Sequence, residues 1–494
     1  MNDRDQLHTL SNCDILVYQK HTTMKKISSM FSTLQEKLHR AKSVSDASTH
    51  HTGQASAAPP SARDRTHRGQ LFFEYLLVVS LKKRRDGDGY DPQIIYQFPK
   101  REVMCRLQRE EEERCMKAVH LFCFPEGINW VPLTQYHSET FSFVLTEVDG
   151  SRRNGYCRRL LPNGSGARTL EAYCIISRVA CFGLFSKIFD EVEKRRQKSK
   201  AMIYPFMQSL RESPLPAPGN TVKITSFIPE SGTEVISLTR PADSWLEHVD
   251  FQTLFRCLTD EEVLLVFTAV VMERRIVFLS EELSTLSQVL HAVAALLYPF
   301  VWQHTFISTV PKVLIDVCSA PTPYLLGVQK NMLELITDRS DLLIVDLSNG
   351  AKTKFITKLG DEESILPVKL KEEVLLVLSA RKHNACTDEL NKVVSEAFLL
   401  VFIRSVGHFS QHFKRCGSGR QFQKKSFLKG VEHKSHLNFV TQFIQTQMFD
   451  LFIQEEETQT NPNGTQHTLL YYINCLFRNK HTLRNIHVHV HVFK

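Results

Sequence analysis

The stretch Glu273–Val328 constrains the fold of this chain more than any other part of its sequence. Short apolar runs of strand length alternate in it with helical patterns: strands at Ile276–Ser280, His304–Ser308 and Tyr324–Val328, and helices at Ser284–Tyr298 and Pro311–Cys318. Leu342–Ser348 repeats the strand signal after one further helical pattern. Because strands that are separated by helices need crossover connections, we expect a parallel sheet with helices on its faces.

The motifs that carry nucleotide or covalent chemistry are missing from this stretch and from the rest of the sequence. There is no P-loop, no G-x-S-x-G elbow and no H-E-x-x-H, and the G-x-G at Gly87 and Gly89 lies in a polar loop ahead of Pro92. His408 and His412 share a helix face, but no third metal ligand accompanies them. We therefore predict no cofactor, no metal and no catalytic side chain. We expect instead a surface that binds another protein.

Composition and charge narrow the class of protein. The 494 residues are 42% hydrophobic and 23% charged, which is typical of a globular chain of about two to four domains. No apolar run reaches the ~20 residues of a membrane span, and the N-terminus lacks the apolar core of a secretory signal, so we expect a cytoplasmic protein. Twelve cysteines without a Cys-x-x-Cys pair predict reduced thiols.

The formal net charge of +8 would suit a nucleic acid or an anionic membrane. Basic residues are interspersed with acidic ones at Arg109–Arg114 and Glu191–Arg196, whereas a nucleic-acid face clusters its basic residues. We expect no nucleic acid partner.

The two ends of the chain differ from its middle. Residues 1–70 are predicted to be mostly disordered, except for a basic amphipathic helix at 24–42. That helix either makes transient contact with an anionic membrane or packs on a protein surface, and both alternatives stay open. Residues 459–494 form an atypical tail in which His487, His489 and His491 alternate with valines; a non-structural terminus is favoured there over a metal site.

The middle divides into three folded regions. Residues 71–212 combine short β-favouring runs with helical patterns at Val103–Val119 and Leu184–Arg196, which predicts an α+β lobe on an antiparallel sheet. Three prolines in 214–219 predict a linker over 213–235, and residues 236–360 form the α/β lobe, with a capping box at Thr259 and Glu262. Residues 361–458 are predicted to be helical throughout, with amphipathic helices at Glu372–Arg381, Asp388–Val406 and Leu437–Ile453.

Several separated blocks resemble the DENN-domain family. ERRIVFLS (273–280), LSTLSQVLHAVAALLYPFVW (283–302) and APTPYLLGV (320–328) are similar to its core signature in order and spacing. The upstream blocks FFEYLLVVSLKK (72–83) and CFGLFSKIFDEVEKR (181–195) look most like subfamily two, and the brief N-terminal extension fits its short form. The resemblance covers about Leu71 to Gln454; the tail after Glu457 departs from it, which suggests an alternative exon or a prediction artefact.

The resemblance implies a bilobal DENN module with a longin-like N-lobe, an α/β central lobe and a helical C-terminal subdomain. It also implies a guanine-nucleotide exchange factor that binds a GDP-loaded or nucleotide-free Rab GTPase across both lobes and promotes GDP release and GTP loading. Subfamily membership suggests the late-endosomal Rab-nine class, and hence transient recruitment to endosomal or other vesicle membranes. Two other classes remain: a GTPase-activating longin-DENN protein, and a Rab-binding scaffold without exchange activity.

No motif marks an individual catalytic residue, because an exchange factor works by binding the nucleotide-free partner better than the nucleotide-bound one. Aromatic, Arg and polar residues on predicted loops and strand ends of the central lobe are the candidate anchors for a Rab. For each of them a core aromatic or an intramolecular ion pair is the alternative. The candidates are Arg274, Arg275, Trp302, Gln303, His304 and Tyr324.

Overall fold

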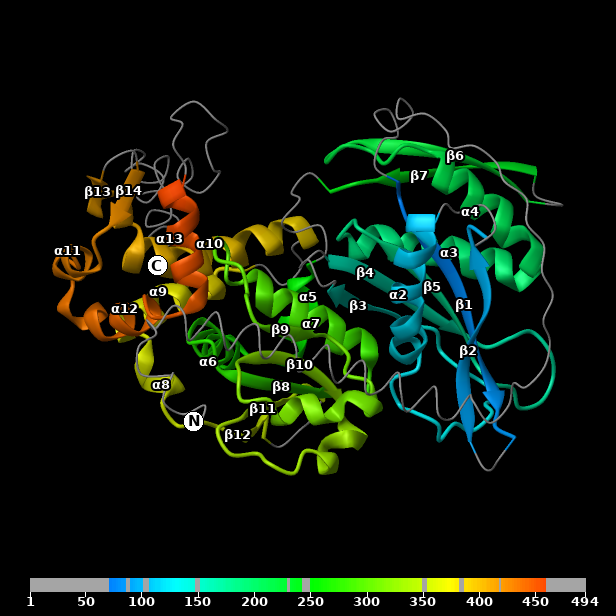
Figure 1. Ribbon diagram of the computed structural model, residues 1–494, viewed down its shortest axis with the longest axis horizontal. Helices are drawn as coiled ribbons and strands as arrows, with labels where there is room; N and C mark the ends of the chain where they lie inside the picture. Colours follow the sequence, from blue (N-terminus) through cyan, green and yellow to red (C-terminus); the bar gives the residue numbers. More distant parts are fainter. Residues whose placement is uncertain are drawn as a thin grey trace, which may run out of the picture. The chain divides into compact units, whose positions relative to one another are not determined.

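The computed structural model describes residues 71–85, 89–100, 106–146, 152–228, 232–241, 249–348, 353–381, 386–416 and 419–458. The helix predicted at 24–42 and the tail at 459–494, with its alternating histidines, lie outside the described residues. The described part contains the mixture of elements that the sequence predicts, with an antiparallel sheet first, a largely parallel sheet next and helices last (Figure 1). The predicted fold class is confirmed.

The N-lobe is built on a five-stranded antiparallel sheet with the order β2-β1-β5-β4-β3. Its strands are β1 (Tyr75–Lys83), β2 (Tyr90–Phe98), β3 (Thr140–Thr146), β4 (Arg152–Leu160) and β5 (Glu171–Ser177). Helix α2 (Arg106–Cys123) connects β2 to β3, while α3 (Phe182–Lys198), the 3-10 helix η3 (Lys200–Met202) and α4 (Ile203–Glu212) follow β5. The two predicted helices of this lobe are present: α2 is described from Arg106 and ends four residues after the predicted Val119, and α3 extends two residues farther than predicted at each end.

The two faces of this sheet are covered by different helices because side chains alternate along each strand. Leu76, Tyr173 and Ile175 point into a core that they share with the apolar stripes of α3 and α4. On the opposite side, Phe122 of α2 stacks on Phe143 of β3 with a ring centroid distance of 4.9 Å. The sheet is therefore buried on both faces.

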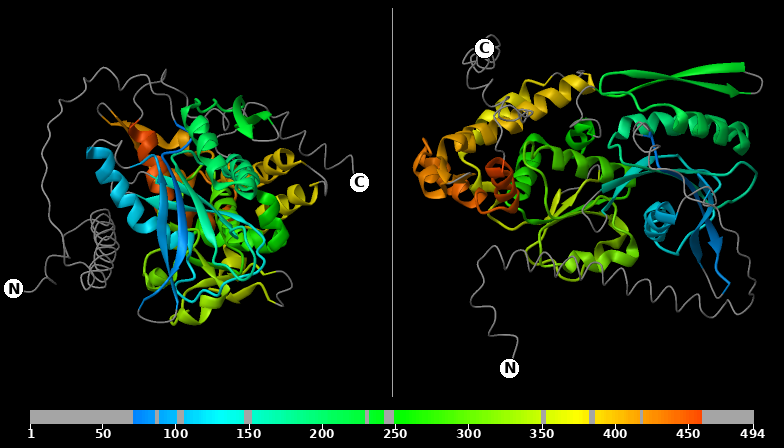
Figure 2. Two further views of the ribbon diagram at one scale, coloured as in Figure 1. Left: turned by 90° about the vertical axis from the view of Figure 1, so that its right-hand side faces the viewer. Right: turned by 45° about the horizontal axis from the view of Figure 1, so that its top comes forward.

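A β-hairpin occupies the later part of the predicted linker at 213–235 and the first residues of the region predicted as the α/β lobe, 236–360. Strands β6 (Thr221–Ile228) and β7 (Gly232–Thr239) pair antiparallel and lie over α3 and α4 (Figure 2). Ile224 and Leu238 join the core beneath the hairpin, whereas Phe227 and Val235 are exposed on its outer face. The prolines at 214–218 precede the hairpin, so they end α4 without preventing strands farther along.

The central lobe is built on a second five-stranded sheet with the order β12-β11-β8-β10-β9. Strands β8 (Arg275–Ser280), β9 (Thr305–Ile307), β10 (Tyr324–Gln329) and β11 (Leu343–Asp346) are parallel, as predicted. A short antiparallel edge strand, β12 (Phe355–Thr357), was not predicted from the sequence. The accompanying helices are α5 (Phe251–Cys257), α6 (Asp260–Val271), α7 (Leu283–Ala295), and the 3-10 helices η4 (Lys312–Ser319) and η5 (Lys330–Leu335).

Local sequence signals set the ends of two of these helices. The predicted capping box is present at the start of α6, since the Thr259 side chain accepts from the Glu262 backbone and Glu262 accepts from the Thr259 backbone. Helix α7 ends at Ala295, earlier than the predicted Tyr298, because the chain turns ahead of Pro299.

The helical subdomain contains α8 (Glu362–Ile365), α9 (Val368–Ser379), α10 (Thr387–Val406), α11 (Lys424–Lys429), α12 (Leu437–Phe443) and α13 (Gln447–Thr458), with 3-10 turns η6 (Phe409–His412) and η7 (Lys434–His436). The prediction of helix throughout is wrong at β13 (Phe413–Cys416) and β14 (Gly419–Phe422), which form a hairpin. The helix predicted at Leu437–Ile453 is divided into α12 and α13. Helix α10 is apolar and long enough to span a membrane by composition, but most of it is buried, as in the core helix of a globular protein.

Candidate functional site

All six residues predicted as Rab anchors lie near the amino ends of strands in the central sheet. Tyr324 at the start of β10 pairs with Arg275 of β8 on one side and with Thr305 of β9 on the other. Arg274 precedes β8, and Trp302, Gln303 and His304 precede β9. The structure therefore brings the candidates together on the side of the sheet where its parallel strands begin. We call this side of the sheet the amino edge.

Two of these candidates, Trp302 and Tyr324, have buried side chains, which agrees with the alternative of a core aromatic. Trp302 is 3% exposed and donates its indole N–H to the carbonyl of Thr305 at 3.1 Å. Tyr324 is 0% exposed and donates its hydroxyl to the carbonyl of Cys318 at 2.6 Å, and burial raises the pKa of that hydroxyl. In this conformation neither side chain is available to a partner.

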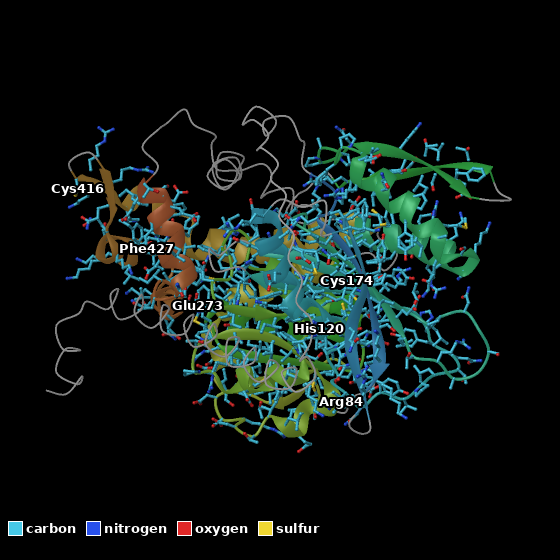
Figure 3. All side chains as sticks on the ribbon, turned by 45° about the vertical axis from the view of Figure 1, so that its right-hand side comes forward. Arg84, His120, Cys174, Glu273, Cys416 and Phe427 are labelled. Atoms are coloured by element: carbon cyan, nitrogen blue, oxygen red, sulfur yellow. The ribbon has the colours of Figure 1, made fainter. Side chains whose placement is uncertain are left out.

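His304 belongs to a contact between the central lobe and the helical subdomain. Its Nε2 lies 3.0 Å from a carboxylate oxygen of Glu273, and the same carboxylate accepts hydrogen bonds from the backbone N–H groups of Gln447 and Met448, both at 2.9 Å. Glu273 thus satisfies the first N–H groups of α13 (Figure 3). Its left-handed φ of 50° turns the chain into β8 at this point.

The remaining candidates also have partners within the chain. Arg274 forms an ion pair with Asp361 at 2.7 Å, and Arg275 donates to the carbonyl of Ser340 at 3.0 Å. Gln303 donates its side-chain amide to the carbonyl of Val301 at 3.0 Å. The amino edge is therefore a structural joint, and the ion pairs and core aromatics named as alternatives describe these side chains in the free protein.

The opposite edge of the same sheet, the carboxyl edge, meets the N-lobe. Ser308, directly after β9, donates its hydroxyl to the carbonyl of Ser142 in β3 at 2.7 Å. The residues that follow β8 and that end β10 make similar contacts: Ser284 donates to the Glu139 carboxylate at 2.7 Å, and Gln329 donates to Glu126 at 3.3 Å. Ligands of parallel sheets bind outside the carboxyl ends of the strands, and here the N-lobe shapes that region.

Glycine permits the close approach of the chains at this junction. A Cβ on Gly327 of β10 would lie 2.1 Å from the backbone oxygen of Ser308, a distance that no side chain tolerates. Next to it, the backbone N–H of Val310 donates to the carbonyl of Gly327, and that of Lys312 donates to the carbonyl of Pro125, both at 2.8 Å. The loop before η4 is thereby held between its own sheet and the N-lobe.

A buried arginine holds the N-lobe side of the junction in place. Arg159 of β4 forms two parallel hydrogen bonds with Glu126, at 2.6 and 2.9 Å, and its guanidinium lies over the rings of Phe124 and Trp130. Burial opposes the charge of Arg159, but the Glu126 carboxylate outweighs that effect and holds the guanidinium pKa above its ordinary value. Nearby, burial raises the pKa of the Tyr136 hydroxyl to about 12.

Exposed apolar side chains lie within four residues, along the chain, of the place where Gly127 of the N-lobe meets Lys312 of the central lobe. The aliphatic stem of Lys312 would lie 3.2 Å from a Cβ placed on Gly127, so the loop after α2 touches the start of η4. Val313, which follows Lys312, is 48% exposed, and Val131, in the loop that begins at Gly127, is 74% exposed. Ile128 is exposed as well. We call Ile128, Val131, Lys312 and Val313 the junction surface.

Cysteine thiols lie in the N-lobe core close to Arg159, which donates its Nε–H to the carbonyl of Cys123. Cys123, Cys157 and Cys174 form a buried group in the N-lobe core, and burial raises their thiol pKa values, which disfavours the nucleophilic thiolate. Among the described residues, no three His, Cys, Asp or Glu side chains gather as a metal-binding group. The junction surface offers apolar contacts, one lysine and a shape set by two lobes at once.

The junction surface was not predicted from the sequence, although one signal for it was present. Ser308 and Gln329 follow or end predicted strands of a parallel sheet, and the rule for such sheets points to their carboxyl ends. The preference for aromatic and arginine anchors directed the prediction to the amino edge instead.

Comparisons with known proteins agree with this architecture. Family models match three consecutive regions: the uDENN domain at residues 92–160, the DENN (AEX-3) domain at 168–350 and the dDENN domain at 422–470. The uDENN match covers nearly all of β2 and the chain through β4, the DENN match covers β5 through β11, and the dDENN match covers α11 through α13; β1 and β12 lie outside the matched regions.

Curated relatives match most of the chain. DENN domain-containing protein 2D of Mus musculus is 55% identical over 398 residues, which cover 80% of this chain and 84% of the relative. The protein of the same name from Homo sapiens is 53% identical over 83% of this chain and 88% of its own length. DENN domain-containing protein 2B of Homo sapiens is 47% identical over 78% of this chain, but only 35% of that longer relative is covered. The predicted resemblance to subfamily two and to its short form is confirmed, and the chain belongs to the DENN-domain family.

Proposed function

We propose that this protein is a guanine-nucleotide exchange factor that promotes GDP release and GTP loading on a Rab small GTPase. Two observations support the proposal. The chain belongs to a family whose members generally act on Rab GTPases as exchange factors. The junction surface exposes apolar side chains from both lobes beside the carboxyl edge of the central sheet. The first observation carries the proposed activity, and the second supports the choice of the junction surface as the binding site, because a partner that rests on both lobes needs apolar contacts from each of them.

The proposed reaction requires no covalent step. An exchange factor binds the nucleotide-free Rab more tightly than the nucleotide-bound Rab, and linkage then requires that Rab bind its nucleotide more weakly by the same factor. A shift of about 10⁴ needs about 5.5 kcal/mol of differential binding. A few well-placed anchors in an interface of ordinary size supply that free energy.

The junction surface suits the task because its two halves belong to different lobes. Val131 lies in the N-lobe and Val313 in the central lobe. A Rab that rests on both would be held against a fixed frame, since Lys312, Gln329 and Ser308 bind the lobes together through hydrogen bonds. We expect this frame to fit the nucleotide-free conformation of the Rab switch regions.

The finer parts of the proposal concern the partner and its place in the cell. We propose the late-endosomal Rab-nine class as the substrate, from the subfamily of the relatives. We also propose that the protein works in the cytoplasm and is recruited transiently to endosomal or other vesicle membranes. A panel of Rab proteins in an exchange assay tests the first of these statements, and cell fractionation tests the second.

The direct experiment is the release of a fluorescent GDP analogue from a Rab panel by the full chain. We expect acceleration for at least one Rab, and a loss of about tenfold or more in the double variant V131D/V313D, because an aspartate in an apolar contact stays desolvated and unpaired. The matched control is V368D/L376D on α9, where the two side chains are 68% and 47% exposed, close to the 74% and 48% of the junction pair.

Other outcomes of this experiment would indicate a different function. Faster phosphate release with unchanged GDP release would indicate a GTPase-activating protein. Equal binding to both nucleotide states, without acceleration of either reaction, would indicate a scaffold. No acceleration for any Rab contradicts the proposal, and equal losses in the junction pair and the control pair contradict the placement of the site.

A further inference from the structure

We propose that the β13–β14 hairpin and α11 form a docking surface for anionic lipid membranes. Its accessible basic residues are Lys414 and Arg415 on β13, and Lys425 and Lys429 on α11; we call these four residues the basic hairpin surface. The proposal is independent of the exchange activity and of residues 24–42. It rests on charge, burial and pairing within the helical subdomain.

Positive charge is concentrated in this part of the sequence. Residues 413–436 contain seven Lys and Arg residues against one acidic residue, Glu432, which gives a net charge of +6 in a chain whose total is +8. Five of the seven are lysines. The interspersed charges at Arg109–Arg114 and Glu191–Arg196 do not extend to this segment.

The hairpin places like charges opposite each other. Arg415 pairs directly with Arg420 across the two strands, an arrangement that destabilises a hairpin unless the charges find partners. Arg420 has such partners within the chain: it donates to the carbonyl of Glu456 at 2.7 Å and lies over the Phe413 ring at 5.2 Å. Arg415 stays exposed, so an external anion would relieve the repulsion.

Helix α11 is anchored through its apolar face and presents its lysines to solvent. Phe427 is buried and stacks on His408 with ring centroids 4.4 Å apart, and the backbone N–H of Gln423 donates to the carbonyl of His412 at 2.8 Å. Lys425 and Lys429, four residues apart, share the exposed face of the helix. Cys416 lies at the outer end of β13, whereas Phe427 lies closer to α13, with its ring 6.2 Å from that of Phe449 (Figure 3).

Acidic residues of α13 hold the base of the hairpin and of α11, while Glu432, three residues after Lys429, is exposed. Glu457 accepts from the backbone N–H of Phe422 at 2.7 Å, Glu456 is buried, and Asp450 pairs with Lys424 at 2.8 Å. Within the part of the chain that the structure describes, none of the four residues of the basic hairpin surface has a carboxylate within ion-pair distance. Their charge is therefore directed outward.

The composition of the surface favours a membrane over a nucleic acid. Single-stranded nucleic acids stack on exposed aromatic side chains, but Phe422 and Phe427 are buried and Phe413 is half-buried. Recognition of phosphates and bases also favours the planar fork of arginine, whereas a diffuse field of lysines attracts an anionic bilayer without directional contacts. Each such residue near an anionic surface strengthens binding by roughly fivefold.

Vesicle co-sedimentation of the full chain tests the proposal. We expect binding to vesicles of phosphatidylcholine with phosphatidylserine, little binding to pure phosphatidylcholine, and a steep loss with added salt. The triple variant K414E/K425E/K429E should bind about 100-fold more weakly, because it loses three such contributions of roughly fivefold each. A second triple variant with glutamine at the same positions should give an intermediate loss, and thermal melting checks that both variants are folded.

A matched control reverses three exposed lysines elsewhere: K187E/K223E/K369E has the same net charge as the first variant and should bind vesicles like wild type. Equal binding by the hairpin variant and this control would overturn the proposal, as would an absence of binding to the anionic vesicles. Tighter binding of the wild type to single-stranded or duplex DNA than to these vesicles at the same salt would assign the surface to nucleic acid instead.

Discussion

The amino and carboxyl edges of the central sheet are the two ends of the same parallel strands, but their surroundings differ. At the amino edge, Arg274, Arg275 and His304 face partners from the same chain, and Trp302 and Tyr324 are core residues. At the carboxyl edge, serine and glutamine side chains bind the N-lobe, and exposed apolar residues remain beside the contact. The first edge joins the central lobe to the helical subdomain, and the second presents a surface.

This difference shows why residue type alone is a poor guide to an interface. Arginine and aromatic residues are enriched among binding anchors, but they also build ion pairs and cores. Burial and pairing decide between the two roles, and both depend on contacts between segments far apart in the sequence. Glu273, for example, bonds with residues more than 170 positions away.

The largest loss of stability is expected from R159A, on the N-lobe side of the carboxyl edge. The substitution leaves the Glu126 carboxylate largely buried and without the arginine that neutralises it. The free energy of unfolding should therefore fall by about 3–5 kcal/mol. Chemical denaturation measures the change. R178A is the control, because half-exposed Arg178 pairs with Glu74 at the surface and its loss should cost about 1 kcal/mol or less. Similar losses in both variants would argue against Arg159 as the anchor of the junction.

A smaller effect is expected from E273A at the amino edge. Two N–H groups at the start of α13 lose their acceptor, and the unfolding free energy should fall by about 1–2 kcal/mol. Exchange activity per folded molecule should remain close to wild type, since the amino edge is a joint and not the proposed binding surface. E334A serves as the control at a highly exposed position. If E273A lost exchange activity while remaining folded, the separation of the two edges would fail.

The smallest expected effect is a dependence of the stability of the helical subdomain on pH. Burial lowers the pKa values of His408 and His412 below the ordinary 6.5, so the folded state binds fewer protons than the unfolded state. The contribution of these two histidines to the free energy of unfolding is therefore fully present above about pH 6.5. It should decrease as the pH falls through that value toward the folded-state pKa values. Thermal melting at a series of pH values measures the trend. H408F, which keeps a ring against Phe427, should reduce the pH dependence; an unchanged slope would contradict the role of His408.

Much of the architecture could be predicted from the sequence. The β8, β9 and β10 segments are apolar runs bounded by helices, and the Thr259 capping box marks the start of α6 locally. The hairpin β13–β14 was missed because its strands have four residues each and carry charged side chains, so neither run shows the alternation of a longer strand. The junction surface was missed because it depends on which edge of the central sheet the N-lobe covers, and no local pattern encodes that contact.

The central claim is that Rab binds at the junction surface beside the carboxyl edge. Its most direct test is the affinity of a nucleotide-free Rab for folded V131D/V313D compared with folded V368D/L376D and wild type, measured by titration calorimetry. The account predicts that the junction pair weakens binding by about tenfold or more, while the control pair stays close to wild type. Equal affinities for all three proteins would contradict it.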